Sequence, residues 1–232
     1  MLGGVYWFQR PDGRLHMIFV GSSAIIQSPS GKQAVFVGTG DVAAILSRFA
    51  PVWDREIELL ILPQRSERRR RDALSLLHRY RIGTLIVPAD ADEQGDSLAE
   101  WREVVESNVT RVMTASVGTS FVLDADVSLV VEMRSPERDG RQTIGARVIH
   151  GAIAIDLIGD HHAIAYVPEQ TLIFLGPSKA DAMRLNDANP RWVVWAEARG
   201  VPPRLDPHIR VINLKDVREV AYVSDGRRLS MR

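Results

Sequence analysis

Apolar and polar positions along the chain repeat mostly with the period of β-strands and, in a few segments, with that of α-helices. Short apolar runs bounded by glycine, proline and polar residues are typical of strands. The predicted strands cover residues 14–20, 23–27, 33–37, 57–62, 84–87, 109–115, 119–123, 127–133, 146–149, 152–158, 171–175, 192–196, 209–214 and 219–223. We therefore expect two sheet-rich halves.

Helical spacing is confined to a few segments. Apolar residues at i, i+3, i+4 and i+7 predict helices over residues 42–49, 66–80, 98–105 and 180–185. Gly83 is predicted to end the second of these as its C-cap. The strands on either side of that helix are both apolar, which indicates a parallel βαβ unit. The pattern as a whole predicts an α/β fold.

Composition narrows the class of protein. The 232 residues are 45% hydrophobic and 25% charged, which suits one soluble globular domain over residues 1–232, with residues 1–13 as a linker or domain edge. The absence of cysteine excludes disulfides and Cys-based zinc sites. A formal net charge of zero argues against a dedicated nucleic-acid binder. No apolar run approaches the roughly 20 residues of a membrane span, and the N-terminus lacks the basic lead of a signal peptide.

Several stretches, in their order and spacing, match one known family. Residues 12–21 resemble D-G-R-L-H-V-T-F-L-D-V-G, and residues 24–32 resemble A-I-L-I-x-T-P-S-G-K. Further matches are residues 35–40 to V-L-I-D-T-G, 57–62 to I-D-x-L-I-L, 155–160 to F-L-L-T-G-D and 189–194 to N-P-x-x-V-V. Together they resemble the metallo-β-lactamase-like C-terminal domain of the ComEC family, membrane channel proteins that internalise DNA in competent bacteria. The resemblance implies a four-layer αββα sandwich.

The residues that would hold two metal ions in that family are changed here. Its His-x-His-x-Asp-His motif falls on Gln64, Ser66, Arg68 and Arg69, and only Asp160 stands at a family ligand position, that of the bridging aspartate. A catalytic zinc takes three protein ligands, usually histidine or carboxylate, and arginine stays protonated. We therefore predict a degenerate site with no cofactor and no hydrolysis. The alternative is an active hydrolase or nuclease with zinc or manganese in a rebuilt site.

That rebuilt site would use Asp160 with His161 or His162. Adjacent residues on a strand point to opposite faces, so the two histidines chelate one ion poorly unless a loop gathers them. The competing interpretation is a loop with two histidines that bind no metal, since histidine has many other uses.

The strongest local charge feature is an arginine run. Arg65 and Arg68, Arg69, Arg70 and Arg71 lie at the start of the second predicted helix, where free N–H groups add to the attraction for phosphate. One interpretation is contact with single-stranded DNA; the favoured one is a solvated helix face with Glu67 and Asp72 as local partners, because charge runs are often only solvated. In a ComEC-like protein the domain would be extracytoplasmic and tethered to the membrane channel portion. A free-standing pseudoenzyme that binds a protein partner is the third hypothesis.

Overall fold

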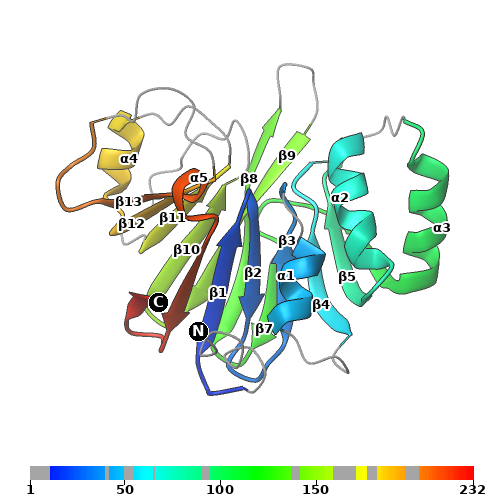
Figure 1. The fold of residues 1–232 in the computed structure, drawn as a ribbon, viewed down its shortest axis with the longest axis horizontal. Helices are drawn as coiled ribbons and strands as arrows, with labels where there is room; N and C mark the ends of the chain where they lie inside the picture. The colour runs from blue at the N-terminus through cyan, green and yellow to red at the C-terminus, as the bar shows by residue number, and fades with distance from the viewer. Residues whose placement is uncertain are drawn as a thin grey trace.

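Two β-sheets packed face to face form the centre of the molecule, and helices cover their outer faces (Figure 1). The computed structural model describes residues 11–39, 42–49, 55–64, 66–89, 95–136, 142–158, 171–176, 182–196 and 204–232. The resulting order of layers is helix, sheet, sheet, helix. This confirms the predicted αββα sandwich.

The first sheet has eight strands in the order β15-β14-β1-β2-β3-β4-β5-β6. Their bounds are β1 (Leu15–Val20), β2 (Ser23–Gln27), β3 (Gln33–Phe36), β4 (Glu56–Ile61), β5 (Arg81–Val87), β6 (Val109–Thr114), β14 (Glu219–Ser224) and β15 (Leu229–Met231). The strands β3 to β6 run parallel, and the others pair antiparallel. The predicted parallel βαβ unit is β4, α2 and β5.

The second sheet has seven strands in the order β13-β12-β11-β10-β9-β8-β7. Their bounds are β7 (Ser120–Asp124), β8 (Val127–Pro136), β9 (Gln142–His150), β10 (Ile153–Ile158), β11 (Leu172–Leu175), β12 (Trp192–Trp195) and β13 (Arg210–Asn213). β10 to β13 run parallel, whereas β7 to β10 form an antiparallel meander. Each sheet is therefore half parallel and half antiparallel.

The helices bury their apolar faces on the outer side of each sheet. α1 (Val42–Phe49), α2 (Glu67–Leu77) and α3 (Leu98–Asn108) cover the first sheet, and α4 (Ala182–Ala188) covers the second. A short helix, α5 (Leu214–Val217), joins β13 to β14. Trp101 packs in the first of these layers and Trp195 in the second, which confirms their prediction as core residues. Among the described residues, no helix is long and apolar enough to cross a membrane.

Gly83 is where the prediction of local structure was wrong. α2 ends with His78 as its C-cap, and Gly83 lies inside β5 rather than closing the helix. A Cβ on Gly83 would lie 2.9 Å from the Glu58 carbonyl oxygen. The glycine therefore allows β4 and β5 to approach closely, a role that spacing along the chain does not reveal.

Aromatic side chains fill one end of the space between the sheets. The ring of Tyr222 lies 5.9 Å from that of Phe19 and 5.5 Å from that of Trp192, both edge-on. Trp192, also predicted to be core, is 5% exposed. Tyr222 is fully buried, and its hydroxyl has no hydrogen-bond partner among the described residues. Burial raises the pKa of that hydroxyl well above its usual range.

Tyr222→Phe is expected to leave stability unchanged or raise it. The substitution removes a polar group that is buried without a partner, and relief of such a desolvation penalty is worth about 1 kcal/mol. Urea unfolding of both proteins measures the difference. Tyr222→Leu is the control, because it also removes the ring contacts and should destabilise by about 1–3 kcal/mol. A phenylalanine variant as unstable as the leucine variant would show that the hydroxyl is satisfied.

Asp124 ties the turn after β7 to the turn between β2 and β3. Its carboxylate accepts hydrogen bonds from the backbone N–H groups of Ser30, at 2.8 Å, and Ala125, at 2.9 Å. The Ser30 side chain is the first cause that lowers the pKa of Asp124 from 3.8 to about 2, and the two backbone hydrogen bonds lower it further, against a smaller rise from burial. The ionised form is therefore favoured by folding. The ionised carboxylate of Asp124 therefore stabilises the folded state above about pH 4, and this stabilisation is lost as the pH falls through about 2.

Asp124→Asn is accordingly expected to destabilise the protein at pH 7 and not at pH 2. The group is mostly solvent-exposed, so we expect a loss of only about 0.5–1 kcal/mol at neutral pH. Urea unfolding of both proteins at pH 7, 4 and 2 measures the effect. A difference in stability that does not change across this range would contradict the assigned hydrogen bonds.

Candidate functional site

The candidate site lies at the carboxyl ends of the parallel strands of the first sheet, where ligands bind in many α/β folds. β4 ends at Ile61, the chain continues through Gln64, and α2 begins at Glu67. Ser66 caps the helix by accepting a hydrogen bond from the Arg69 N–H at 3.4 Å. The structure thus places Gln64, Ser66, Arg68 and Arg69, which the resemblance aligns with metal ligands, at one strand-to-helix junction.

Arg69 points into this site. Only 7% of its surface is exposed, and its Nη1 donates a hydrogen bond to the Ser22 hydroxyl at 3.3 Å. Because a guanidinium stays protonated, the site holds a fixed positive charge. A metal cation in the same place would meet that charge in a partly desolvated setting, where repulsion is strong.

A hydroxyl network occupies the opposite wall of the site. Ser22 donates its N–H to the Thr39 carbonyl at 3.0 Å, and its hydroxyl accepts the Thr39 N–H at 2.6 Å. The two hydroxyls lie 2.9 Å apart. Ser23 accepts the Gly38 N–H at 2.8 Å. Ser22, Ser23 and Thr39 offer neutral hydroxyls and Gly38 has no side chain, so these residues offer no anionic oxygen to a metal.

The mouth of the site is closed toward the second sheet. Gln64 forms an isolated antiparallel bridge with Thr143, and Ile144 donates its N–H to the Pro63 carbonyl at 2.9 Å. A cavity of about 10 Å³ remains, lined by Ser22, Phe36, Gly38, Pro63, Gln64, Arg69, Thr143 and Gly176. That volume admits about one water molecule.

The residues of this site do not fit zinc or manganese. Both ions need several histidine or carboxylate donors, and none of the described residues that line the cavity supplies one. Across the described part of the chain, no group of three or more His, Cys, Asp and Glu side chains could hold a metal ion. Asp160, His161 and His162, the residues of the alternative site, lie outside the described residues.

The helix divides the arginine run into two pairs. Arg68 and Arg71 are exposed, whereas Arg69 and Arg70 are buried. Arg71 forms an ion pair with Glu67, one turn earlier. Arg65 lies outside the described residues. The sequence predicts one continuous run of positive charge. In the structure, only Arg68 and Arg71 among its described members present their side chains to solvent.

Asp72 lies beside the arginines on the same helix. Burial raises the pKa of its carboxyl, and the positive charges of Arg69 and Arg68 oppose that rise. Glu67, the other acid beside the run, forms an ion pair with Arg71.

The network of Ser22, Thr39 and Gly38 was not found as a unit from the sequence. Their neighbouring turns are 17 residues apart along the chain and meet only through the pairing of β1, β2 and β3. The signal in the sequence was that acidic residues of the resembled family are absent at the turns around Ser22 and Gly38. That signal did not indicate that the two turns would be joined by hydrogen bonds between hydroxyl and backbone groups.

Comparison with solved structures shows what this fold resembles. CmlA, a diiron β-hydroxylase from Streptomyces venezuelae, is 11% identical over 80% of this chain, with a TM-score of 0.53; the chain spans 45% of the length of CmlA. A diphosphatase of the PhnP family is 10% identical over 82% of this chain and 80% of its own, with a TM-score of 0.54. The Rm3 metallo-β-lactamase is 14% identical over 68% of this chain and 62% of its own, with a TM-score of 0.44.

No protein-family profile matches the sequence, and no curated protein is significantly similar to it. At identities of 10–11% the structural likeness shows the fold alone. With its two mixed sheets flanked by helices, this chain has the fold of the metallo-β-lactamase superfamily.

Proposed function

We propose that this chain is a catalytically inactive metallo-β-lactamase-like domain that serves as a structural part of a ComEC-like DNA-uptake protein. The observation that carries the first half of the proposal is the buried guanidinium of Arg69, which is hydrogen-bonded to Ser22 at the junction where the ComEC resemblance implies metal ligands. Its fixed positive charge would repel a metal ion bound there.

Three features of the site argue against hydrolysis. A metal in this fold would supply an activated water as nucleophile, and the site has no donor set for that metal. Among the described residues at the site, none is a histidine or carboxylate that could act as general base in its place. The cavity has room for about one water and none for a substrate.

The ComEC-like role is supported by the matching stretches of sequence at residues 12–21, 24–32, 35–40, 57–62, 155–160 and 189–194. An inactive domain would keep the fold because the sandwich packs against the membrane channel portion. The expected location is extracytoplasmic and membrane-tethered.

Metal content and nuclease activity of the same preparation test the inactive site. After incubation with zinc and manganese and exhaustive desalting, we expect well below one ion per chain and no cleavage of single-stranded DNA. One or two bound ions, together with cleavage abolished by Asp160→Ala, would overturn the proposal in favour of the rebuilt site. If Asp160→Ala retained as much metal as the unaltered protein and neither protein cleaved DNA, the metal would be bound elsewhere in the chain. The proposal of an inactive site would then stand.

DNA contact is a second candidate role, favoured by the exposure of Arg68 and Arg71 on one turn of α2. We expect weak, salt-dependent binding of single-stranded DNA. Replacing both arginines with alanine should lower the slope of log K against log salt by about 1.4, because each phosphate contact on a single strand contributes about 0.7.

The matched control removes Arg227 and Arg228, two exposed arginines in the turn between β14 and β15, and changes the net charge equally. An equal loss of affinity in both double variants would show a general charge effect and exclude a site on α2. If the protein bound no DNA even at low salt, the DNA-contact role would be excluded. The remaining hypotheses would be the structural role and a free-standing pseudoenzyme with a protein partner.

A further inference from the structure

The strand β6 is the open edge of the first sheet. Among the described strands it pairs with β5 alone. Ala115, directly after β6, donates its N–H to the Val87 carbonyl at 2.7 Å, so the backbone groups of every second residue counted back from it point to β5. The N–H and C=O groups of Thr110, Val112 and Thr114 therefore point away from the sheet. Such a row of outward backbone groups is a template for a further strand.

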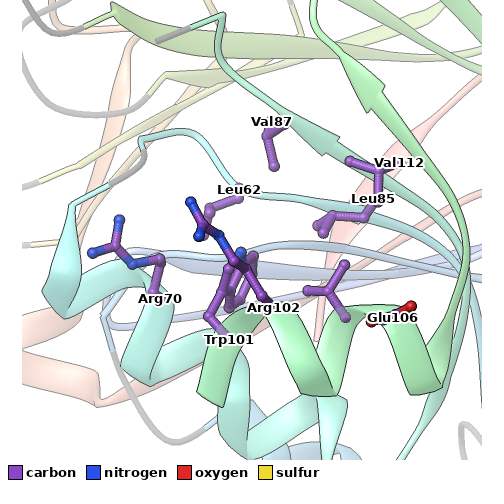
Figure 2. A pocket seen from close by; sticks show the side chains of 9 residues that line it. Leu62, Arg70, Leu85, Val87, Trp101, Arg102, Glu106 and Val112 are labelled. Carbon is purple, nitrogen blue, oxygen red and sulfur yellow. The ribbon is translucent and has the colours of Figure 1, made fainter. Parts of the chain in front are cut away.

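Val112 gives this edge an apolar side chain. The register places it beside Leu85, and Figure 2 shows both side chains, together with that of Val87, at one cavity of about 240 Å³ between the sheet and α3. Leu85 and Val87 are at most 3% exposed, whereas Val112 is 51% exposed. Apolar surface thus continues from the buried outer face of the sheet to its edge, and α3 leaves that edge partly uncovered.

Arg111 is the only charged residue of β6, and it limits how a second β6 strand could pair with the first. An antiparallel pair centred on Arg111 would set its side chain against its own copy, and like charges directly opposite are destabilising. A pair centred on Met113 would leave Thr110 without a partner in the strand. A pair centred on Val112 sets Val112 against itself and Thr110 against Thr114 of the second copy, so it uses every outward backbone group and separates the two arginines.

The outward residues of β6 are complementary to themselves. Threonine, valine and threonine at positions 110, 112 and 114 have the same order in both directions, and a twofold interface needs such symmetry because one set of residues serves both partners. Threonine pairs and valine pairs across antiparallel strands are stabilising. The flanking helix α3 carries exposed charges of both signs, Arg102, Glu103 and Glu106, so the choice of partner rests on the strand and not on net charge.

We propose that two copies of this chain associate through β6, in an antiparallel pair centred on Val112 that joins their first sheets into one. Stable interfaces bury about 800 Å² per partner, and the edge of a six-residue strand offers less, so the dimer is a weak one. We expect a dissociation constant of about 10–100 µM. The proposal is independent of the metal question, because β6 contributes no residue to the lining of the site around Arg69.

Sedimentation equilibrium measures the association. We expect Val112→Lys to weaken it by about tenfold or more, because two ammonium groups would face each other across the twofold axis in place of two valines. The matched control is Val122→Lys, the same substitution at a valine that is 77% exposed on the other edge strand, β7. It should dimerise like the unaltered protein. A protein that stays monomeric up to about 1 mM, or equal weakening by both variants, would overturn the proposal.

Cysteine cross-linking tests the register, since the chain has no cysteine of its own. In the proposed pair the Cα atoms of the two Val112 residues lie about 5.5 Å apart, within the range that a disulfide spans. Under mild oxidation, Val112→Cys is expected to form the cross-linked dimer about tenfold faster than Val122→Cys, which meets its copy only in random encounters. Equal rates for these two variants, or faster cross-linking of Met113→Cys than of Val112→Cys, would contradict the proposed pairing.

Discussion

Replacing Gly38 with alanine is expected to destabilise the protein by about 3 kcal/mol or more, and Gly38→Asp to prevent folding, because the new side chain meets backbone that cannot give way. A Cβ at this position would lie 1.8 Å from the Ser22 carbonyl oxygen, 2.1 Å from its carbonyl carbon and 2.4 Å from its hydroxyl oxygen. Real Cβ atoms essentially never approach other atoms within 3.0 Å. The segment around Ser22 would have to move, and the hydrogen bonds to Thr39 would break with it.

The comparison that isolates this clash is Gly118→Ala, measured by urea unfolding alongside Gly38→Ala. Gly118 has no atom within 4 Å of its Cβ position and a φ of +81°, so alanine there meets backbone strain without a clash. Such strain costs about 1–2 kcal/mol. Equal destabilisation by the two substitutions would show that Ser22 does not pack against Gly38 as described.

The same clash bears on the proposed alignment, which sets Gly38 opposite the acid of I-D-T-G. The Ser22 backbone leaves no space for an acid side chain at position 38. A metal site built on that alignment would therefore need a different turn between β1 and β2 as well as new side chains at Gln64, Ser66, Arg68 and Arg69.

Most of the sandwich could be predicted because the strand segments either alternate apolar and polar residues or are continuously apolar over a few residues. Both patterns are typical of β-strands. The short elements α5 and β15 escaped prediction, since α5 spans four residues and β15 three. Periodicity needs a longer window than either offers. Their existence follows from tertiary packing: Leu214 and Leu229 both join the core between the sheets.

The strand, loop and helix start at the junction of β4 and α2 could be predicted because each is encoded locally. Which arginine of the run is buried could not be predicted. Arg68 and Arg69 are adjacent in the sequence, yet the helical period turns the first to solvent and the second inward. Which arginine is buried depends on the rotation of α2 against the sheet, and that is set by Ala73, Leu76 and Leu77 in its packed face.

A buried ion pair in the second sheet was likewise outside the reach of sequence pattern. Asp156 stands in the middle of an apolar strand, where Ile155 and Leu157 point between the sheets and Asp156 points to the opposite face. Its partner Arg147 lies on the neighbouring strand β9, directly opposite in register. A charge in an otherwise apolar strand implied a partner, but only the pairing of β9 with β10 identifies it.

Asp156→Ala is expected to destabilise the protein by about 3–5 kcal/mol, because it leaves the guanidinium of Arg147 buried without its carboxylate. The pair is bidentate, with Arg147 Nε 2.6 Å from Asp156 Oδ1 and Nη2 3.0 Å from Oδ2, and the side chains are 9% and 3% exposed. For comparison, Glu219→Ala breaks the exposed pair with Arg48, whose side chains are 38% and 54% exposed, and should cost at most about 1 kcal/mol.

The double variant Arg147→Met/Asp156→Leu separates the cost of an unpaired charge from the worth of the pair. Replacing both ions with apolar residues of similar volume is often neutral or stabilising, so we expect it to recover most of the loss caused by Asp156→Ala. Urea unfolding of the unaltered protein, Arg147→Met, Asp156→Leu and the double variant completes a thermodynamic cycle, and Asp156→Ala is measured beside them. If the double variant were as unstable as Asp156→Ala, the destabilisation would come from lost packing around β10, and the burial of an unpaired Arg147 would not be its cause.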